Sequence, residues 1–511
     1  MSQLSLCDRG PFTPCPAPFN MARHVLSAGH AAPDKIALSI LGLARAERWS
    51  FAKLETAVRG TATGLLQAGL IPGQIVLMRI GNAVDFPIAY LGAIAAGLVP
   101  VPTSAQLTPR EVAQMIATVA PSAILLGEGI AAPDTPLPLI GPDALRAMRD
   151  LPPADWHMGD PERPAYIVFT SGTSGTPRAV QHAHRAIWAR QMMHDGWYGL
   201  QAEDRLLHAG AFNWTFTLGT GLMDPWTRGA TALIPAEGTP LESLPLLLKR
   251  HEATLFAAAP GVYRKLLSHH PQLSLPKLRH GLSAGEKLSD RIREDWRAAT
   301  GLEIHEAFGM SEVSTFLSGS PAAPAAPGTL GRPQQGRRIA ILGHDGTPVP
   351  MGEDGTIAVA RTDPGLMLGY LGAAEATAAR MSGDWFLTGD QGRMAPDGSV
   401  TYAGRSGDMM NAGGYRVSPL EVEAALADLP GVTEIAVTDV EVKEDATLIA
   451  AFYTGTPQDP DTLSALAAER LARYKQPRIW RHLDALPRNP NGKLQRAALR
   501  ALWETPHDRE A

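Results

Sequence analysis

The chain has 511 residues, which is more than one ordinary hydrophobic core accommodates, so at least two domains are expected. Hydrophobic residues make up 45% and charged residues 19%, values typical of a globular protein. The formal net charge of −5 argues against nucleic acid or an anionic membrane as the main partner. The two cysteines, Cys7 and Cys15, form neither a disulfide framework nor a metal site.

The N-terminal stretch MSQLSLCDRGPFTPCP lacks a basic segment followed by an apolar core, so we predict no signal peptide and a cytoplasmic location. The longest apolar stretch begins at Phe86 and reads FPIAYLGAIAAGLVPVP. Glycine and proline interrupt it, and it is too short to cross a membrane. We expect a buried helix that ends at Gly97 and leads into a strand.

Strand-like and helical segments alternate along the first two thirds of the chain. GQIVLMRI precedes an alanine-rich helix near Ala95, SAILL follows TPREVAQMIATV, and ATLFAAA precedes GVYRKLLSHH. Strand–helix repeats with short connections predict an α/β fold with parallel sheets covered by helices. Near Gly355, Gly-Asp and Asp-Gly turns between short strands predict a small antiparallel, barrel-like part. After Arg405, two strands between two helices predict a small α+β domain.

A loop of small, hydroxyl-bearing residues, TSGTSGTPR, follows the apolar run that ends at Phe169. Gly172 and Gly175 leave backbone N–H groups accessible to a ligand, and Arg178 adds a cation. Such donors suit phosphate oxygens, although the loop lacks the Walker A pattern and also fits an ordinary surface turn. Its hydroxyl groups belong to Thr170, Ser171, Thr173, Ser174 and Thr176.

This loop resembles the phosphate-binding signature of the adenylate-forming superfamily, which includes acyl-CoA synthetases, luciferases and peptide-synthetase adenylation domains. The family loop usually ends in lysine, and Arg178 keeps the charge but not the geometry. The segment EAFGMSE resembles the family's aromatic-Gly-x-Thr-Glu motif. The resemblance implies that Phe308 stacks on adenine, Ser311 contacts the α-phosphate and Glu312 holds Mg²⁺, with Gly309 beside nucleotide and acyl group.

Two further segments resemble the family's nucleoside-binding motifs. SAGEKL, which begins at Ser283, resembles the turn that lines the adenine site, and this implies contacts from Gly285 and Glu286. WFLTGDQG resembles the segment whose aspartate, here Asp390, accepts hydrogen bonds from both ribose hydroxyls. Arg405 would hold the ribose as well.

GRSGDMMNAGGYRVSPLEVE, from Gly404, resembles the family's hinge and the start of its C-terminal domain. The family hinge residue is generally aspartate or lysine, whereas here it is Gly407. The resemblance implies an N-terminal adenylation domain at 1–404, a hinge at 405–408 and a mobile C-terminal domain at 409–511. Gly413, Gly414 and Tyr415 would contact CoA. LPRNPNGKLQR resembles the catalytic-lysine motif, with Lys493 as the lysine, although spacing alone favours a solvated side chain.

The stretch HAGAFNWTFTLGTGLMDPWTRGAT, from His208, is similar to medium-chain acyl-CoA synthetases and benzoate-type CoA ligases. Phe212 and Trp214 would line the acyl pocket, which favours a medium-chain, branched, alicyclic or aryl monocarboxylate. A core helix with aromatic packing is the alternative. We assign no ligand role to His182 and His184, which would point to different faces of a helix.

The resemblance covers essentially the whole chain and implies an acid–CoA ligase that uses ATP, Mg²⁺ and CoA. The acid and ATP would give acyl-AMP and pyrophosphate, and the acyl group would then pass to the CoA thiol. One alternative is a stand-alone enzyme that loads a carrier protein. Another is a non-catalytic nucleotide-binding homologue, because Arg178 and Gly407 depart from the family pattern. The sequence leaves the acid and the oligomeric state open, with a homodimer as one alternative.

Overall fold

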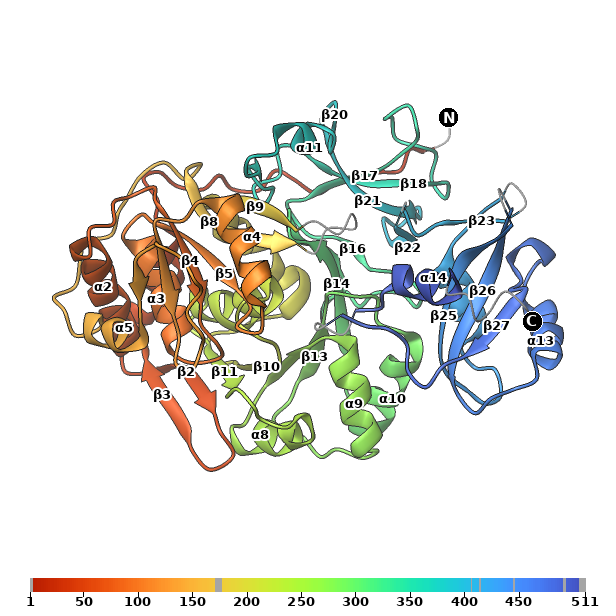
Figure 1. Ribbon diagram of the computed structural model, residues 1–511, viewed down its shortest axis with the longest axis horizontal. Helices are drawn as coiled ribbons and strands as arrows, with labels where there is room; N and C mark the ends of the chain where they lie inside the picture. The colour runs from red at the N-terminus through yellow and green to blue at the C-terminus, as the bar shows by residue number, and fades with distance from the viewer. Residues whose placement is uncertain are drawn as a thin grey trace. The chain divides into compact units, whose positions relative to one another are not determined.

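The computed structural model describes residues 3–170, 177–405, 407–412, 415–443, 446–489 and 493–504 (Figure 1). The chain divides into two compact units. The N-terminal unit consists of Cys7–Ile339 and Val359–Phe386, and the C-terminal unit of Met1–Leu6, Ala340–Ala358 and Leu387–Ala511. The division falls within four strands, which are β1 (Leu6–Asp8), β17 (Arg338–Leu342), β18 (Asp354–Ala360) and β21 (Trp385–Met394). The predicted boundaries at 404 and 408 stay a prediction.

A nine-stranded sheet forms the centre of the N-terminal unit, in the order β16-β15-β14-β13-β12-β10-β11-β2-β3. The six strands from β14 to β2 run parallel, and β15 and β3 are antiparallel to their neighbours. This confirms the predicted parallel sheet. The strands are β2 (Ile36–Leu41), β3 (Ala46–Ser50), β10 (Arg205–His208), β11 (Thr231–Pro235), β12 (Leu255–Ala258), β13 (His280–Ser283), β14 (Ile304–Met310), β15 (Ser314–Ser318) and β16 (Arg332–Pro333).

Helices α8 (Leu244–Arg250), α9 (Pro260–His269) and α10 (Asp290–Thr300) connect the strands β11 to β14. Their buried residues Leu247, Tyr263 and Trp296 share one hydrophobic cluster with Phe256 of β12. The three helices therefore cover one face of this part of the sheet, as parallel strands buried on both faces require.

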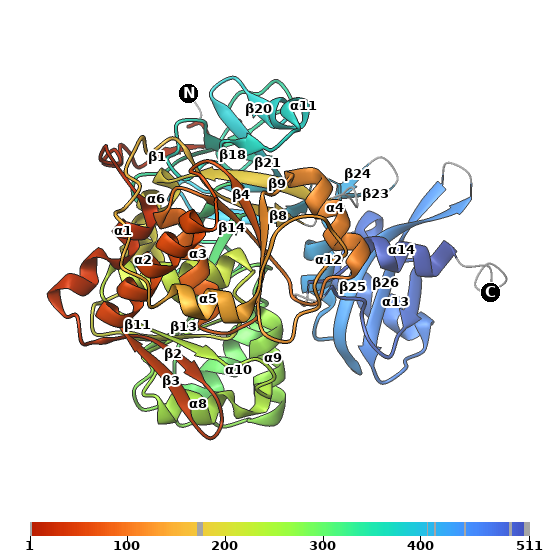
Figure 2. The same ribbon diagram turned by 60° about the vertical axis from the view of Figure 1, so that its left-hand side comes forward.

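A second parallel sheet has the order β5-β4-β6-β7, with β4 (Ile75–Arg79), β5 (Val99–Thr103), β6 (Ala123–Leu126) and β7 (Leu139–Ile140). Helices α2 (Phe51–Gln67), α3 (Asp85–Ala95) and α5 (Pro142–Met148) lie side by side (Figures 1 and 2). Helix α4 (Pro109–Val119) connects β5 to β6. Two glycines allow α2 to approach α5 and α3, because a Cβ on Gly64 would overlap Met148 and one on Gly92 would crowd Thr61.

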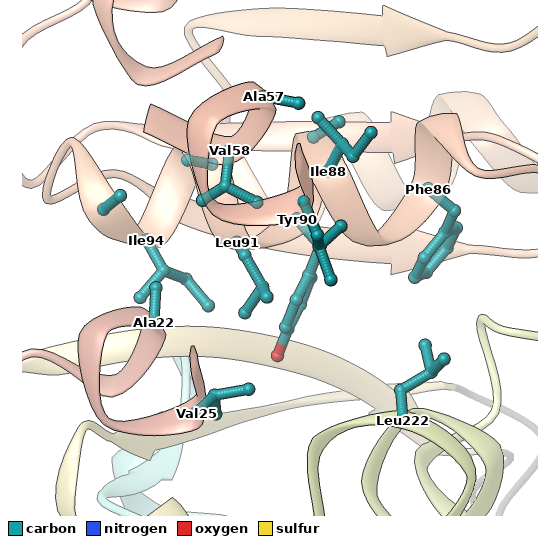
Figure 3. Packing of buried hydrophobic residues seen from close by; sticks show 14 of the residues in the cluster. Ala22, Val25, Ala57, Val58, Phe86, Ile88, Tyr90, Leu91, Ile94 and Leu222 are labelled. Atoms are coloured by element: carbon teal, nitrogen blue, oxygen red, sulfur yellow. The ribbon is translucent and has the colours of Figure 1, made fainter. Parts of the chain in front are cut away.

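The apolar run from Phe86 is the predicted buried helix. All residues of α3 are buried, the helix ends at Ala95, and Gly97 with φ +78° turns the chain into β5. Figure 3 shows Leu91 and Ile94 of α3 between Ala57 and Val58 of α2 and Ala22 and Val25 of α1 (Met21–Leu26). Among the described residues, none of the helices has the length and apolar character that a membrane crossing requires.

A small three-stranded sheet, β19-β9-β8, frames the hydroxyl-rich loop. β8 (Pro164–Thr170) and β9 (Arg178–Ala183) form an antiparallel hairpin, and β19 (Gly369–Tyr370) pairs with β9 on its other edge. Thr170 and Arg178, the two ends of the hydroxyl-rich segment, are paired with each other in this hairpin. Residues 171–176 lie outside the described part of the chain.

The C-terminal unit contains the predicted antiparallel hairpin and the α+β tail. β21 pairs antiparallel with β22 (Val400–Arg405) around the Asp397–Gly398 turn. In the tail, β25 (Val432–Lys443), β26 (Ala446–Gly455) and β27 (Ile479–His482) form one sheet. Val422 and Leu426 of α12 (Pro419–Leu426) and Leu463 of α13 (Pro460–Arg470) pack against it. The remaining tail elements are β23 (Met410–Ala412), β24 (Tyr415–Val417) and α14 (Arg496–Glu504).

Short elements complete the described chain. The remaining strands are β1 (Leu6–Asp8) and β20 (Met381–Ser382), and the remaining α-helices are α6 (Arg185–Ala189), α7 (Asp224–Thr227) and α11 (Ala374–Ala378). Two π-helical segments, His194–Tyr198 and Thr217–Met223, flank the acyl-pocket candidates.

Candidate active site

The motif with the candidate phosphate and metal residues is a tight turn between β14 and β15. β14 carries Phe308 and Gly309, and the turn carries Ser311 and Glu312. A Cβ on Gly309 would overlap the backbone of Ser314 and Thr315, so the close approach of the two strands requires glycine here. Ser314 itself has φ +74°, an uncommon value for a residue with a side chain.

Three contacts from other strands and loops hold this turn. The His182 Nε2–H donates to the carbonyl oxygen of Ser311 at 2.7 Å. The Met367 N–H donates to the carbonyl oxygen of Glu312 at 2.8 Å. The Tyr370 hydroxyl donates to Oε1 of Glu312 at 2.7 Å. Backbone and side chain of the turn are therefore both fixed, which is the preorganisation that a catalytic group needs.

His182 lies on the strand β9 and not on a helix. Its ring stacks on Tyr166 of β8, with ring centroids 4.9 Å apart. Burial lowers the pKa of His182 to about 4, so the ring is neutral near neutral pH. A carbonyl oxygen only accepts hydrogen bonds, and the contact with Ser311 therefore places the proton on Nε2.

Glu312 is a buried carboxylate with few protein partners. Only 6% of its surface is exposed, and the described residues provide no other side-chain hydrogen bond to it than that of Tyr370. Burial, followed by the neighbouring Glu312, raises the pKa of Tyr370. The guanidinium carbon of Arg178 lies 5.1 Å from the centroid of the Tyr370 ring.

Two buried arginines hold the strand that follows the turn. Arg190 of the segment after α6 binds both carboxylate oxygens of Asp224, at 2.9 and 2.6 Å, and also donates to the Ser314 hydroxyl. Burial opposes its charge, but Asp224 raises the pKa of Arg190 above its usual value. Arg337 pairs with Asp363 and donates to the Thr315 carbonyl oxygen at 3.0 Å. Neither arginine was predicted from the sequence.

The candidate adenine and acyl residues are neighbours in the N-terminal unit. Gly285 has φ +98°, and a Cβ there would lie 2.7 Å from the Trp214 ring. The Trp214 ring in turn contacts Phe216 edge to face, with centroids 5.1 Å apart. Phe308 packs edge to face on Phe316 at 5.5 Å. Glu286 is half-buried on the same turn as Gly285.

Phe212 lies deeper than Trp214. It is fully buried and stacks on Phe86 of α3 at 5.2 Å, whereas Trp214 is half-buried. His208 lies against Phe216 at 4.4 Å, and burial lowers its pKa to about 3. The His208 Nδ1 accepts from the Gly210 N–H at 3.0 Å, which places the proton of the neutral ring on Nε2.

The candidate ribose-binding residues lie together in the C-terminal unit. Asp390 of β21 is paired in register with Arg405 of β22. Its Oδ1 accepts from the Tyr402 hydroxyl at 3.0 Å and lies 3.8 Å from the Arg405 Nε. Burial, followed by Asp390, raises the pKa of Tyr402 well above its usual value. The motifs in the sequence did not indicate Tyr402. A register shift between Gln391 and Gly392 places it opposite Gly392, on the face of Asp390.

The candidate hinge and lysine also belong to the C-terminal unit. A Cβ on Gly407 would meet no atom within 4 Å, so steric fit does not require glycine there. Gly413 and Gly414 lie outside the described residues, and Tyr415 is described only as part of β24. Two hydrogen bonds join Lys493 and Asn489. The backbone N–H of Lys493 donates to the side-chain Oδ1 of Asn489, and the Asn489 N–H donates to the Lys493 carbonyl oxygen, both at 2.9 Å.

No group of three or more histidine, cysteine, aspartate or glutamate residues with the geometry of a metal site occurs in the described part of the chain. A magnesium site on Glu312 would therefore take its other ligands from phosphate and water, which is usual for this ion in nucleotide sites. Glu312 fits such a role, because it is a buried carboxylate whose Oε1 is oriented by Tyr370.

Comparisons with known proteins agree over nearly the whole chain. The family model described as AMP-binding enzyme matches residues 27–371, and the model described as AMP-binding enzyme C-terminal domain matches residues 421–493. The human mitochondrial acyl-coenzyme A synthetase ACSM2A is 30% identical, with 95% of this chain and 91% of the relative covered. The 3-hydroxybenzoate–CoA ligase of Aromatoleum sp. (strain CIB) is 29% identical, with 91% and 93% covered.

Solved structures give the same result for the fold. A benzoate CoA ligase from Burkholderia xenovorans LB400 has a TM-score of 0.84 at 28% identity, with 94% of this chain and 100% of that chain covered. An anthranilate CoA ligase in complex with anthranoyl-AMP has a TM-score of 0.86 at 25% identity, with 96% and 98% covered.

Proposed function

The chain belongs to the AMP-binding enzyme family and is an ATP-dependent acid–CoA ligase, and we propose here how its own residues perform the two half-reactions. The acid and ATP give acyl-AMP and pyrophosphate, and the acyl group then passes to the CoA thiol. Activation is necessary because a carboxylate is a poor electrophile without a good leaving group. The difficult event is the approach of a carboxylate anion to a negatively charged α-phosphate.

The observation that carries the proposal is the fixed position of Glu312. No described residue forms an ion pair with Glu312, and a buried carboxylate without such a partner is costly, so this site is suited to a cation that arrives with the nucleotide. Glu312 would hold Mg²⁺, which would supply positive charge at the phosphates. Ser311, whose carbonyl oxygen is held by His182, would donate from its hydroxyl to the α-phosphate.

The other residues would bind the remaining parts of ATP. Phe308 would stack on adenine beside the turn of Gly285 and Glu286, and Asp390 with Arg405 would bind the ribose hydroxyls. Residues 170–176 and Arg178 would grip the β- and γ-phosphates. The adjacency of Asp390, Tyr402 and Arg405 supports the ribose assignment, because the carboxylate is already oriented by the neighbouring strand.

Lys493 would neutralise charge as the acid attacks the α-phosphate. We propose that the C-terminal domain, at 409–511, turns about 405–408 between the half-reactions, so that Lys493 serves adenylation and Gly413, Gly414 and Tyr415 serve CoA. The open space where a Cβ on Gly407 would lie supports a hinge there, and glycine can absorb the change in φ and ψ that a hinge requires.

The substrate would be a medium-chain, branched, alicyclic or aryl monocarboxylate. The aromatic surroundings of Trp214, Phe216 and Phe212 support an apolar acid, and two of the similar proteins are ligases of benzoate and 3-hydroxybenzoate by name. A cytoplasmic location stays a prediction, since ACSM2A and other curated relatives are mitochondrial by name. A homodimer is likewise a prediction.

The test is acid-dependent ATP–pyrophosphate exchange across aliphatic, alicyclic and aromatic acids, followed by thioester formation with CoA or a carrier protein. We expect exchange that requires both Mg²⁺ and an apolar acid, and a CoA thioester as the product. If ATP binds but no acid in the panel supports pyrophosphate exchange, the proposal is contradicted. Acyl transfer to a carrier protein but not to CoA would contradict the assigned acceptor.

A further inference from the structure

Tyr370 lies beside the candidate phosphate and metal residues but has no role in the adenylation mechanism proposed above. β19 pairs antiparallel with β9, and Tyr370 is directly opposite Val180. Because side chains alternate along a strand, Arg178 lies on the same face of β9 as Val180 and is a diagonal neighbour of Tyr370. The small sheet thus brings a residue far along the chain beside the end of the phosphate loop.

Both ends of the Tyr370 residue are fixed. Its backbone N–H donates to the Thr377 hydroxyl at 2.9 Å, and its own hydroxyl donates to the Glu312 Oε1 at 2.7 Å. Tyr370 is 5% exposed and Glu312 6% exposed. A hydrogen bond to a carboxylate in a site with so little water is strong and directional.

Arg178 contacts the face of the same ring. Its guanidinium carbon lies 5.1 Å from the ring centroid, within the range of a cation–π contact. A guanidinium is planar and stacks on an aromatic ring, whereas an ammonium is a compact, strongly hydrated charge. The contact therefore gives a structural reason for arginine at a position where the resembled family usually has lysine.

We propose that Tyr370 is a positioning residue for the nucleotide's magnesium, and that Arg178 holds the Tyr370 ring by stacking. The hydroxyl fixes one oxygen of Glu312, so the other lone pairs of the carboxylate keep one orientation toward the ion. Arg178, at the end of the phosphate loop, is thereby coupled to Glu312 through the ring. This inference rests on the proposed role of Glu312.

The first test is the Tyr370→Phe variant, which keeps the ring and removes only the hydroxyl. Calorimetry measures the binding of α,β-methylene-ATP with Mg²⁺ and with EDTA. We expect affinity with Mg²⁺ to fall about tenfold, since one charge-assisted hydrogen bond is lost, and affinity in EDTA to stay unchanged. The Mg²⁺ concentration that half-saturates pyrophosphate exchange should rise in parallel. Unchanged binding, or an equal loss with and without Mg²⁺, would overturn the proposal.

The matched control is Tyr453→Phe. Tyr453 is also buried, and among the described residues its hydroxyl forms hydrogen bonds with the backbone of Gln458, so this variant likewise loses the hydrogen bonds of a buried tyrosine hydroxyl. Its binding of the nucleotide should show the wild-type dependence on Mg²⁺. A magnesium effect of the same size in Tyr453→Phe would mean that general destabilisation causes the result, and this would overturn the role of Tyr370.

The stacking contact is tested by Arg178→Lys in two backgrounds. With Tyr370 present, we expect a loss of Mg²⁺-dependent affinity of about threefold, the size of a modest cation–π contact. With Tyr370→Leu, which has no ring, the same substitution should cause a smaller loss, because only the proposed phosphate contact of Arg178 is then altered. Equal losses in both backgrounds would overturn the coupling. Should Tyr370→Phe not fold, Arg178→Lys alone decides, because an equal loss with and without Mg²⁺ contradicts the proposal.

These binding measurements need no acid, so they distinguish this inference from the proposed function. Wild-type protein that binds the nucleotide identically with and without Mg²⁺ would contradict the role of Glu312 itself. If nucleotide binding depends on Mg²⁺ in the wild-type protein and to the same extent in Tyr370→Phe, only the role of Tyr370 is contradicted.

Discussion

Asp390 has the environment of a carboxylate that is held ready for a diol. Its backbone pairs with Arg405, and its Oδ1 accepts from Tyr402, so the neighbouring strand sets its orientation. Only 5% of its surface is exposed, which strengthens any hydrogen bond that it accepts.

We predict that Asp390→Asn raises the KM for ATP about tenfold, because the amide provides one acceptor and no charge for the two ribose hydroxyls. The variant should also lose much of the wild-type preference for ATP over 2′-deoxy-ATP in pyrophosphate exchange. The control is Asp354→Asn, since Asp354 is an exposed carboxylate paired with Arg393. An unchanged preference between the two nucleotides would contradict the ribose assignment.

The site residues that the sequence indicates lie in contiguous motifs, such as Glu312 beside Phe308, or Asp390 within WFLTGDQG, and their roles stay predictions. The positioning residues could not be found in this way. Tyr370 is 58 positions from Glu312, and His182 is 129 positions from Ser311. Their roles depend on which strands become neighbours, and a lone tyrosine or histidine in an apolar segment resembles a core residue.

At the scale of elements, the turn between β14 and β15 depends on the buried pair of Arg190 and Asp224. The guanidinium binds both carboxylate oxygens and the Ser314 hydroxyl, and the Tyr198 hydroxyl donates to Asp224 at 2.6 Å. Since Ser314 has positive φ, this network compensates an unfavourable backbone conformation next to Glu312.

We predict that Asp224→Asn lowers the free energy of unfolding by about 3–5 kcal/mol, because it leaves a buried guanidinium without a countercharge. Urea denaturation measures the change. The double variant Arg190→Met with Asp224→Leu should recover part of the loss, since no buried charge remains unpaired. A single variant as stable as the wild type would show that the pair does not hold the turn.

The alternation of strands and helices was sufficient to predict the parallel sheets, the buried helix α3 and the α+β tail. It could not predict strand order. β2, at Ile36–Leu41, pairs with β11, at Thr231–Pro235, and no local pattern indicates so distant a partner. It did not predict β9. Nor did it predict β19, because a strand of two residues has no periodicity to detect.

Across the whole molecule, buried neutral histidines make the N-terminal unit sensitive to acid. Burial lowers the pKa of seven histidines there, among the described residues, to about 3 or about 4: His24, His182, His184, His194, His208, His280 and His305. In the unfolded chain, histidines bind protons once the pH falls below their usual pKa of 6.5. In the folded protein, the seven buried histidines bind protons only when the pH approaches their lowered pKa values. Stability is therefore complete above about pH 6.5 and falls as the pH falls through this window.

We predict that the melting temperature falls steadily as the pH is lowered from about 7 to about 5. Over this range His208 alone should lower the free energy of unfolding by about 2 kcal/mol. In His208→Gln the dependence of the melting temperature on pH should be shallower. His269→Gln, which changes an exposed histidine, should behave like the wild type. If all three proteins show the same dependence, protonation of His208 is not coupled to unfolding.

The central claim for the molecule as a whole is that Lys493 serves only the first of the two half-reactions. Glu312, the proposed magnesium ligand, belongs to the N-terminal unit, and Lys493, whose backbone N–H donates to the Asn489 Oδ1, belongs to the C-terminal unit. A lysine that only neutralises charge at the α-phosphate is needed when the acyl-adenylate forms. It is not needed when a thiol attacks the finished adenylate.

Lys493→Ala tests this claim most directly, with both half-reactions measured on the same preparation. We predict that acid-dependent ATP–pyrophosphate exchange falls by about a hundredfold to a thousandfold, the usual cost of one preorganised charge. Formation of the CoA thioester from a supplied acyl-adenylate should be largely retained. An equal loss of both activities, or full retention of the exchange reaction, would contradict the division of labour proposed here.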